Sequence, residues 1–418
     1  MPYRHPAPEA GALTHAGRPD VGSCRAWALA LAIALASVFV ASGCGGTART
    51  RTGSPPAVHV PGTGGTPPVA GRELSGVPSP WGEIAGSLVS LGLPQDRVRA
   101  FFRSPGLSYN PSPMETKLRE LFPIFFRSDL TKAIQERLWQ LGYDLTVDGR
   151  NGPGTRRAIE AYQKDGGNAA DGRVTQALAD ELERKLATGR VRPLSQYRPP
   201  AARPPDRSST NRRFTDAAAI SRLRAMYQAD RPIFERMERA YHVPGQLVAS
   251  IMWIETSYGG YFGSAKAAAN LASMAASADY GLIAPHVADL GRDREARAFL
   301  AETAAKRGAW ARDELAALLR YAWANGLDPM EFPGSIYGAV GYGQFMPSNI
   351  AKFAVDGDGD QKIDLFQKAD AVFSIGNFLR EHGWSGDMSS EDKRRGVIRK
   401  YNNSGVYVNT VLYVMEHL

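Results

Sequence analysis

The sequence of 418 residues has little cysteine, no long alternation of apolar and polar residues, and no stripe of basic residues with interleaved aromatics. Its cysteines are Cys24 and Cys44, both near the N-terminus, which excludes a disulfide framework and thiol chemistry in the remainder of the chain. Because strand patterns are missing, the chain is predicted to be mainly α. Many of the arginines behind the net charge of +8 lie in proline-rich segments, so we expect solvated linkers and no nucleic-acid partner.

An apolar run at residues 26–40 is too short for a comfortable membrane span, but it suits the core of a signal peptide. Small residues follow it, and Ala41-Ser42-Gly43-Cys44 resembles a bacterial lipobox in which Ala41 stands where leucine is usual. We therefore predict a lipoprotein signal peptide over residues 1–44 and lipidation of Cys44. An uncleaved anchor and ordinary cleavage near Ala41 are the alternatives.

Segments rich in glycine, proline and arginine divide the chain into parts. Residues 45–77 are predicted to form a flexible, disordered tether, and residues 187–213 a second linker rich in proline and arginine. Between these segments lie helical patterns at residues 78–127 and a compact module at residues 128–186. From residue 214 to residue 418 the chain is mostly helical, with glycine and proline at the helix ends.

A helix pattern with one carboxylate near its end precedes the pair Gly259 and Gly260. In this pattern Glu255 shares a stripe with the apolar residues Val248 and Ile251. Partial burial and the negative end of the helix dipole both raise the pKa of a carboxyl group in this position. A raised pKa suits a general acid at neutral pH, although an exposed glutamate at the end of an amphipathic helix would give the same pattern.

A glycine-rich segment at residues 338–348 has no strand before it and no Lys-Ser or Lys-Thr pair after it, so it does not match a phosphate-binding loop. We expect its backbone to pack against another element or a sugar. Gln344 would offer a donor and an acceptor, while Phe345 and Met346 would form an apolar wall. A buried junction between a helix and a loop is the alternative. Farther on, the pair Tyr401-Asn402 suits either hydrogen bonding to a sugar or a helix-capping turn.

An acidic loop has the ligand spacing of a calcium-binding loop. The carboxylates and the one backbone carbonyl at that spacing come from Asp356, Asp358, Asp360, Lys362 and Asp364. Gln361 stands where glycine is expected and Gln367 where a bidentate glutamate is expected, but Asp370 can supply the missing carboxylate. We predict a structural Ca²⁺ site, with an unoccupied acidic turn as the alternative.

The module at residues 128–186 contains three helix patterns separated by glycine turns, with Thr155 and Thr175 as the expected caps of the second and third helices. Its ordered residues are Gln135, Leu138, Leu141-Gly142-Tyr143, Val147-Asp148-Gly149, Gly154, Thr155, Ala158, Tyr162-Gln163, Asp171-Gly172 and Val174-Thr175. In this order they resemble the three-helix peptidoglycan-binding domain of bacterial wall enzymes. The resemblance implies peptidoglycan as a partner, through either its stem peptide or its glycan.

Residues 214–418 carry a second set of ordered motifs. They are Glu255-Thr256-Ser257-Tyr258-Gly259, Gly-Tyr-Gly-Gln-Phe-Met-Pro-Ser at residues 341–348, the acidic loop, Gly383-Trp384 and Tyr401-Asn402. This set resembles the lytic murein transglycosylases of the membrane-bound B type. The resemblance implies a lysozyme-like helical catalytic domain in which residues 78–127 are the N-terminal part and the module is an insertion. Residues 279–315 depart most from the family pattern.

The resemblance also implies a reaction. Glu255 would protonate the β-1,4 bond between N-acetylmuramic acid and N-acetylglucosamine, and would then accept the proton of the C6 hydroxyl as a 1,6-anhydro ring closes. No cofactor is needed for this chemistry, and calcium would be structural. The residues expected to contact the substrate are Ser257, Tyr258, Tyr342, Gln344, Phe345, Met346, Tyr401 and Asn402.

Two other functions remain open from the sequence. A hydrolytic muramidase would need a second carboxylate, for which the sequence offers no convincing candidate outside the acidic loop. The second open function is that of a wall-binding lipoprotein without catalytic activity. The expected location is the periplasm of a Gram-negative bacterium, with a lipid anchor in the outer membrane because Gly45 follows Cys44 in place of aspartate. Other wall enzymes are further expected partners.

Overall fold

A computed structural model describes residues 73–418 except residues 190, 202–203 and 386–387. Helices dominate this part of the chain, and its two strands form one small sheet, so the predicted mainly α architecture is confirmed. The predicted signal peptide, the lipidation site Cys44 and most of the predicted tether lie outside the described residues. Within the described part, no helix is both long and apolar enough to cross a bilayer.

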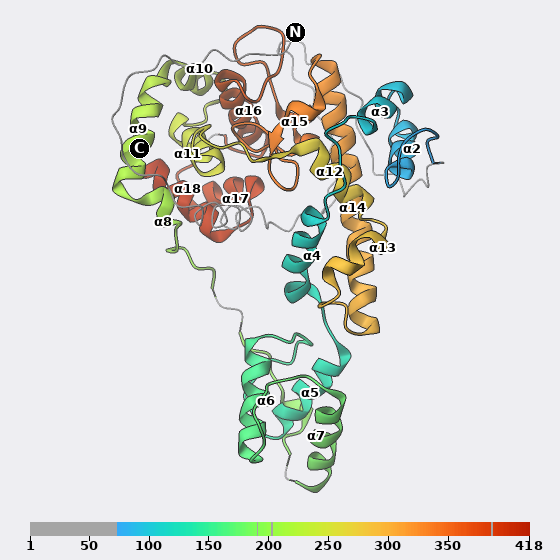
Figure 1. Cartoon of the computed structure of the whole chain (residues 1–418). Helices are drawn as coiled ribbons and strands as arrows, with labels where there is room; N and C mark the ends of the chain where they lie inside the picture. Colours follow the sequence, from blue (N-terminus) through green and yellow to red (C-terminus); the bar gives the residue numbers. More distant parts are fainter. Residues whose placement is uncertain (1–72, 190, 202–203, 386–387) are drawn as a thin grey trace, which may run out of the picture.

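Two separate hydrophobic cores organise the described chain into a large helical unit and a small module (Figure 1). The large core joins residues 81–118 to residues 214–414, although the module stands between them in the sequence. The module at the bottom of Figure 1 is therefore an insertion into the large unit, connected to it at both ends.

The large unit begins with α2 (Gly82–Ser90), α3 (Gln95–Phe102) and α4 (Ser112–Phe125). After the module it continues with α8 (Arg212–Thr215), α9 (Ala217–Ala229), α10 (Arg231–Tyr241), α11 (Gly245–Thr256), β1 (Ala265–Lys266), α12 (Ala267–Ala276), α13 (Tyr280–Ile283), η2 (Ala284–Val287), α14 (Arg294–Ala324), η3 (Pro329–Glu331) and β2 (Pro333–Gly334). The last elements are α15 (Pro347–Phe353), α16 (Lys368–Glu381), α17 (Glu391–Tyr401) and α18 (Gly405–His417).

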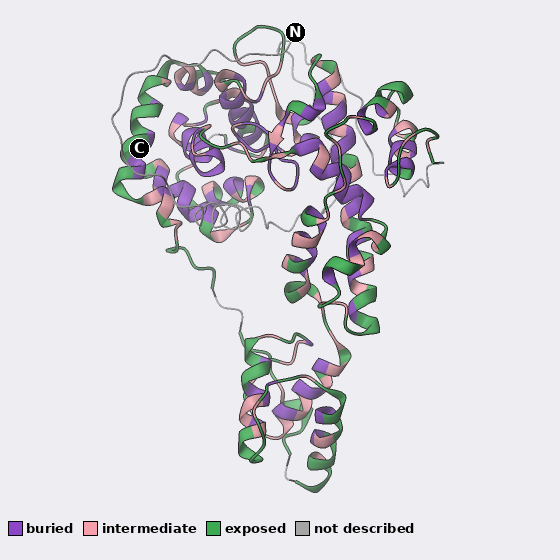
Figure 2. Cartoon of the chain, viewed as in Figure 1, coloured by how far each residue is buried: buried purple, intermediate pink, exposed green. Residues whose placement is uncertain are grey.

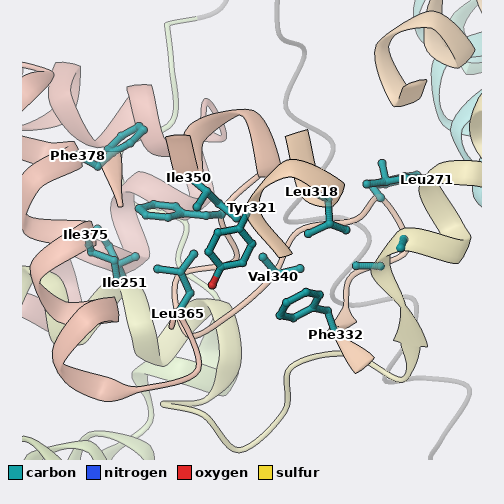
Figure 3. Packing of buried hydrophobic residues seen from close by; sticks show 14 of the residues in the cluster. Ile251, Leu271, Leu318, Tyr321, Phe332, Val340, Ile350, Leu365, Ile375 and Phe378 are labelled. Atoms are coloured by element: carbon teal, nitrogen blue, oxygen red, sulfur yellow. The ribbon is translucent and has the colours of Figure 1, made fainter. Parts of the chain in front are cut away.

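The 31-residue helix α14 is the longest helix of the described chain, and α4, α12 and α15 pack along it. Asp293 caps its start by accepting a hydrogen bond from the Ala296 amide, and Gly326, with φ of 68°, turns the chain just beyond its end. Gly308 allows close packing, because an added Cβ would lie 2.5 Å from the Cβ of Ala278. Figure 3 shows side chains of α12, α14 and α16 that belong to the large core, among them Leu271, Tyr321 and Phe378.

The small sheet determines where the glycine-rich segment lies. Strands β1 and β2 are antiparallel, with Ala265 opposite Gly334. Two further bridges, Gly334 to Val340 and Val340 to Phe345, fold residues 335–345 back on themselves. This compact fold holds the glycine-rich segment against the core of the large unit.

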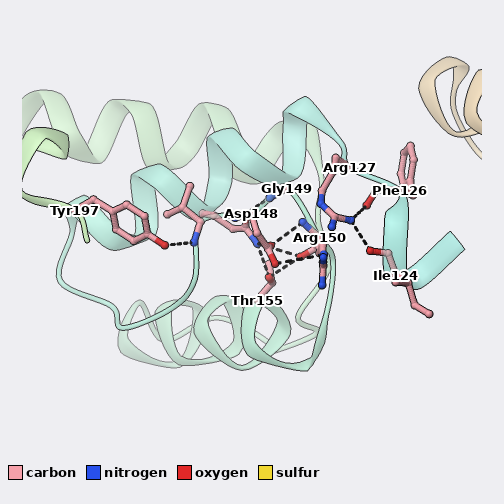
Figure 4. Close-up of polar contacts among 10 residues, drawn as sticks. Ile124, Phe126, Arg127, Asp148, Gly149, Arg150, Thr155 and Tyr197 are labelled. Carbon is pink, nitrogen blue, oxygen red and sulfur yellow. Dashed lines mark hydrogen bonds and ion pairs between the residues drawn. The ribbon is translucent and has the colours of Figure 1, made fainter. Parts of the chain in front are cut away.

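The module consists of α5 (Asp129–Gln140), α6 (Pro153–Asp165) and α7 (Gln176–Thr188), followed by η1 (Leu194–Gln196). Buried residues of all three helices, coloured purple in Figure 2, form its hydrophobic core. The fully buried Gln135 organises the first loop: its amide group donates to Asp148, to the Arg150 carbonyl and to Thr155, and its oxygen accepts from the Asp148 and Gly149 amides. Figure 4 shows these loop residues.

Both ends of the predicted 187–213 linker are packed against folded parts. Tyr197 lies edge-on to Trp139, and its hydroxyl oxygen accepts a hydrogen bond from the Val147 amide (Figure 4), so the segment up to residue 197 belongs to the module. On the other side, the Asp206 carbonyl accepts from Asn409, and Arg207 pairs with Asp392 at 2.9 Å. The connection between the two folded parts is therefore shorter than the sequence pattern indicated.

Candidate active site

Helix α11 carries Glu255 and runs through the middle of the large unit. Every residue of this helix except Gln246 is buried, so the predicted single apolar stripe is only part of a surface that is covered all round. Glu255 itself is 7% exposed. The carboxyl group therefore sits in the protein interior.

The end of α11 turns sharply away from Glu255. Ser257, Tyr258 and Gly259 all have positive φ, at 51°, 61° and 88°. A left-handed conformation costs roughly 1 kcal/mol for a residue with a Cβ, so the first two are held by their surroundings. Gly259 is required because an added Cβ would lie 2.3 Å from the Tyr342 ring. This turn brings the glycine-rich segment against the end of α11.

Burial raises the pKa of Glu255 to about 7, while the nearby hydroxyl of Tyr407 opposes this effect. Tyr407 is the third residue of α18, and burial, together with the negative charge of Glu255, raises the pKa of Tyr407. Its hydroxyl makes no hydrogen bond of standard geometry in the structure. A carboxyl group with a pKa of about 7 can both donate and accept a proton near neutral pH.

Glu255 lines a cavity of about 110 Å³. The residues around it are Lys117, Glu255, Arg307, Trp310, Tyr337, Gln344, Phe345, Met346, Asn349, Phe378, Tyr401 and Asn402. Among these described lining residues, Glu255 is the one carboxylate. A larger hollow of about 440 Å³ lies beside α17, between His382 and Lys400, but neither Glu255 nor any other carboxylate lines it. We therefore place the chemistry in the smaller cavity.

Buried polar atoms without a partner cluster at this cavity. In the described part of the chain there are four such side-chain atoms, and two of them, Gln344 Oε1 and Tyr337 Oη, belong to lining residues. The Tyr337 hydroxyl has the Glu120 carboxylate beside it, and the Tyr407 hydroxyl has that of Glu255, so Gln344 Oε1 is the unpartnered atom that a ligand would satisfy. An unsatisfied buried polar group costs about 1–3 kcal/mol, so the Gln344 oxygen indicates a ligand that completes its hydrogen bonds.

Five of the predicted substrate contacts lie around the cavity: Gln344, Phe345, Met346, Tyr401 and Asn402. The Gln344 amide donates to the Gly341 carbonyl at 3.2 Å, which directs its free oxygen. The Tyr401 hydroxyl donates to the Gly343 carbonyl at 2.5 Å and so ties α17 to the glycine-rich segment. The structure therefore brings the two motifs to the same carboxylate.

The other three predicted contacts, Ser257, Tyr258 and Tyr342, lie outside the cavity lining. The Tyr258 hydroxyl donates to Asp230 at 2.9 Å, and Lys368 pairs with the same carboxylate at 2.7 Å. Tyr342 packs against Gly259 and lies edge-on to a neighbouring phenylalanine ring. Tyr258 and Tyr342 thus brace the turn after α11 instead of lining the cavity.

The sequence pattern missed several lining residues, among them Lys117, Arg307, Trp310 and Tyr337. Lys117 lies on α4, before the inserted module. Arg307 and Trp310 lie on α14, within the segment that departs most from the family pattern. Tyr407 was also missed, although its position shortly after Tyr401-Asn402 at the start of the final helix was a usable signal.

The acidic loop gathers three of its predicted ligands. One carboxylate oxygen each of Asp356, Asp358 and Asp370 lies within 4.8 Å of the others. Asp370 is buried and accepts from the Gly357 amide at 2.8 Å and the Asp364 amide at 2.6 Å. Burial, together with the neighbouring negative charges, raises its pKa to about 6. Converging carboxylates of this kind suit a hard cation such as Ca²⁺.

The remaining predicted ligands are not in that group. The carboxylate of Asp360 accepts from the Lys362 amide at 2.8 Å, and that of Asp364 accepts from the Phe366 amide at 2.9 Å. Gln361, which replaces the usual glycine, adopts φ of 68°, so the substitution does not prevent the turn. The residues fit a calcium site centred on three carboxylates.

Comparison with known proteins gives a consistent picture. The transglycosylase SLT domain family matches residues 168–395, more than half of the chain, and the peptidoglycan binding domain family matches residues 127–182. Membrane-bound lytic murein transglycosylase B of Escherichia coli (strain K12) is 31% identical over 149 residues, which span 36% of this chain and 34% of that protein. The match thus covers about a third of the length of this curated relative.

Solved structures are similar at lower identity. The soluble lytic transglycosylase SltB1 from Pseudomonas aeruginosa is 22% identical, with a TM-score of 0.41 over 63% of this chain and 98% of its own. The Escherichia coli lytic transglycosylase Slt35 in complex with calcium is 18% identical, with a TM-score of 0.41 over 68% of this chain and 97% of its own. By the family match over more than half of its length, the chain belongs to the transglycosylase SLT domain family, and it also carries a peptidoglycan-binding domain.

Proposed function

We propose that the protein is a lytic transglycosylase that cleaves the β-1,4 bond between N-acetylmuramic acid and N-acetylglucosamine in peptidoglycan. The observation that carries this proposal is Glu255. It is the one carboxylate among the described residues of the cavity, and its pKa is raised to about 7. The family match supports the reaction class, and the peptidoglycan-binding module supports the substrate.

Glu255 acts first as an acid in this mechanism. Its protonated carboxyl group donates to the glycosidic oxygen as the bond breaks, and the 2-acetamido oxygen of the muramyl residue stabilises the positive charge that develops at C1. The unpaired Gln344 Oε1 is available to accept a hydrogen bond from the sugar. The leaving N-acetylglucosamine carries away the proton, and Glu255 is left ionised.

Glu255 then acts as a base. The C6 hydroxyl of the muramyl residue gives its proton to the carboxylate, and its oxygen bonds to C1, which closes the 1,6-anhydro ring. The acid is thereby restored and no water is consumed. Tyr407 stabilises the ionised state between the two steps, since its hydroxyl lowers the pKa of Glu255.

The rival is a hydrolytic muramidase, which uses two carboxylates roughly 5–9.5 Å apart. Mass spectrometry of digested peptidoglycan separates the two, because anhydro-muramyl products are lighter than reducing ends by one water. We expect anhydro products from the wild type. We expect Glu255→Gln to lose activity by about 10²–10⁴-fold, the usual contribution of general acid–base catalysis. Reducing ends would refute the transglycosylase mechanism. An active Glu255→Gln would refute the role of Glu255 and indicate another catalytic site, whereas a wild type that cleaves no glycan would leave the wall-binding lipoprotein.

The same proposal includes calcium and the cell envelope. Asp356, Asp358 and Asp370 would hold a structural Ca²⁺, which would neutralise the charges that these carboxylates bring together. Asp360, Asp364 and the Lys362 carbonyl are the further ligands that the loop spacing favours. The cation takes no part in the reaction on Glu255.

Lipidation of Cys44 would anchor the protein to the outer membrane and place the catalytic unit in the periplasm. The relative from Escherichia coli is named as membrane-bound, which agrees with an envelope location. Fractionation of cells that express Cys44→Ala tests the anchor, and release of the variant from membranes is the expected result. Pull-down of the wild-type protein from membranes would identify other wall enzymes as partners.

A further inference from the structure

One buried hydroxyl group connects the end of α11 to the glycine-rich segment at residues 338–348. Thr256, the residue after Glu255, is 2% exposed and takes no part in the mechanism above. Its Oγ1 lies 3.1 Å from the carbonyl oxygens of Met252 and Tyr342, so its proton is shared between them. The same oxygen accepts a hydrogen bond from the Gly259 amide at 2.9 Å. Thr256 therefore joins α11, the left-handed turn after it and the glycine-rich segment.

The segment on the far side of this hydroxyl carries a lining residue of the cavity. The Tyr342 carbonyl lies two residues before Gln344, whose Oε1 is an unpartnered buried atom in the cavity lining. The Tyr342 amide donates to the Leu365 carbonyl at 3.0 Å, so both backbone polar groups of Tyr342 are held. Thr256 thus lies between Glu255, its neighbour in the chain, and the backbone that presents Gln344.

A second hydrogen bond joins the same two segments, and it is longer. The Gln344 Nε2 donates to the Phe262 carbonyl at 3.5 Å. This distance lies beyond the usual range of an N–H···O bond, so the Thr256 contact at 3.1 Å is the stronger of the two. The position of the glycine-rich segment against the end of α11 therefore depends on the Thr256 hydroxyl.

We propose that Thr256 is a positioning residue, whose hydroxyl fixes the Glu255 carboxyl group and the Gln344 side chain relative to each other. The inference rests on the proposed function. Thr256 lies outside the cavity lining, so it acts through these two residues and touches no substrate. Proton transfer needs the acid within about 2.6–3.2 Å of the glycosidic oxygen, and a misplacement of about 1 Å can lower the rate about 10²-fold.

The test compares two variants that differ in the hydroxyl. Thr256→Val keeps the shape of the side chain and removes the hydroxyl, whereas Thr256→Ser keeps the hydroxyl. The measured quantities are kcat and KM for the release of anhydro-muramyl products from glycan strands. Thr256→Val should lower kcat about ten- to a hundredfold with little change in KM, because the lost interaction acts on the transition state. Thr256→Ser should restore kcat to within about threefold of the wild type.

A weaker hydrogen-bonding group of similar size provides a second variant. If Thr256→Val does not fold, Thr256→Cys takes its place, because a thiol is both a weak donor and a weak acceptor. We then expect kcat to fall by about threefold or more, again with little change in KM. A cysteine variant as fast as the serine variant would contradict the role of the hydroxyl.

Thr410→Val is the matched control, because Thr410 is as buried as Thr256 and makes similar hydrogen bonds away from the cavity lining. Thr410 is 1% exposed, donates to the Val406 carbonyl at 2.7 Å and accepts from the Asn211 amide at 2.9 Å. We expect Thr410→Val to lose stability but to keep the wild-type kcat. An unchanged kcat in Thr256→Val, an equal fall in Thr410→Val, or a serine variant as slow as the valine variant would overturn the proposal.

Crystal structures of the full-length variants keep the inference separate from the proposed function. The distance between the Glu255 carboxyl group and Gln344 Oε1 should differ by about 1 Å between the wild type and Thr256→Val, and should stay the same in Thr410→Val. A shift in Thr256→Val alone supports the positioning role even if the wild type cleaves no glycan. An equal distance in all three proteins rejects it, whatever the activity of the wild type.

Discussion

The hydroxyl group of Tyr407 lies beside the carboxyl group of Glu255 and lowers its pKa, against the larger effect of burial. These residues come from α18 and α11, which pack against each other in the large core. A residue of the last described helix, α18, therefore influences the pKa of Glu255, which lies about 150 residues earlier in the sequence. The balance between burial and this hydroxyl determines how much of the acid form is present at neutral pH.

Tyr407→Phe should move the alkaline limb of the pH–activity profile upward, because the variant loses the group that lowers the pKa of Glu255. The rate at the optimum should also fall, since the ionised intermediate state loses its donor. The pH dependence of kcat/KM for the release of anhydro-muramyl products measures both effects. Tyr413→Phe, on the same helix, is the control. An alkaline limb that moves downward would contradict the role given to Tyr407.

Glu255→Gln should make the protein more stable at alkaline pH than the wild type. The folded-state pKa of about 7 lies above the ordinary value of 4.5, so the folded state binds more protons between these values. The contribution of Glu255 to stability is then fully present below about pH 4.5 and falls by about 3 kcal/mol as the pH rises through 7, from 1.36 kcal/mol per pKa unit. Denaturant unfolding of both proteins at pH 5 and pH 8 measures the difference.

The exposed Glu416→Gln is the surface control for this measurement. We expect the free energy of unfolding of Glu255→Gln, relative to the wild type, to be larger at pH 8 than at pH 5. If the difference between the two proteins were the same at both pH values, the buried carboxyl group would not carry the raised pKa.

Removal of calcium should lower the melting temperature of the wild type. A cation present at 100 times its dissociation constant stabilises a protein by about 2.7 kcal/mol, which chelation would remove. Asp358→Ala, in the three-carboxylate group, should be insensitive to the chelator, whereas Asp360→Ala should keep most of the response because its carboxylate lies outside that group. A wild type that does not respond would show that the loop is an unoccupied acidic turn.

Gln135→Leu should destabilise the module by about 3 kcal/mol, since it leaves the Asp148 and Gly149 amides without their acceptor. The module and the large unit have separate cores, so a scanning calorimeter should show one transition moving and the other staying in place. Gln176→Leu, at an exposed position of α7, serves as the control. Parallel shifts of both transitions would mean that the two parts unfold together.

Local sequence patterns predicted the positions of the helices better than they predicted the residues that line the cavity. The helix pattern at Glu255 and the cap at Thr175 depend on residues close in sequence, and α7 does begin with Thr175 accepting from the Leu178 amide. The expected cap at Thr155 was wrong, because α6 already begins at Pro153 and Thr155 instead bonds to Gln135 within the module. There a buried tertiary partner outweighed the local capping preference.

Lys117 and Arg307 show why the rest of the cavity was not predictable. They are 190 residues apart in the sequence, and no short motif connects them. They meet because α4 packs along α14, which depends on the shape of the whole core. The same limit applies to Ser257 and Tyr258: their neighbours in sequence suggested substrate contact, but both lie in a left-handed turn and outside the cavity lining.

The insertion of the module between α4 and α8 also has a consequence for proteolysis. A single cut between residues 198 and 205 would divide the chain into two fragments, but α2, α3 and α4 on the first fragment share one core with the helices of the second. The fragments would therefore stay associated as a non-covalent heterodimer. The cavity around Glu255 would then be assembled from two polypeptides, with Lys117 on one and Arg307 on the other, and the nicked enzyme would separate only under denaturing conditions.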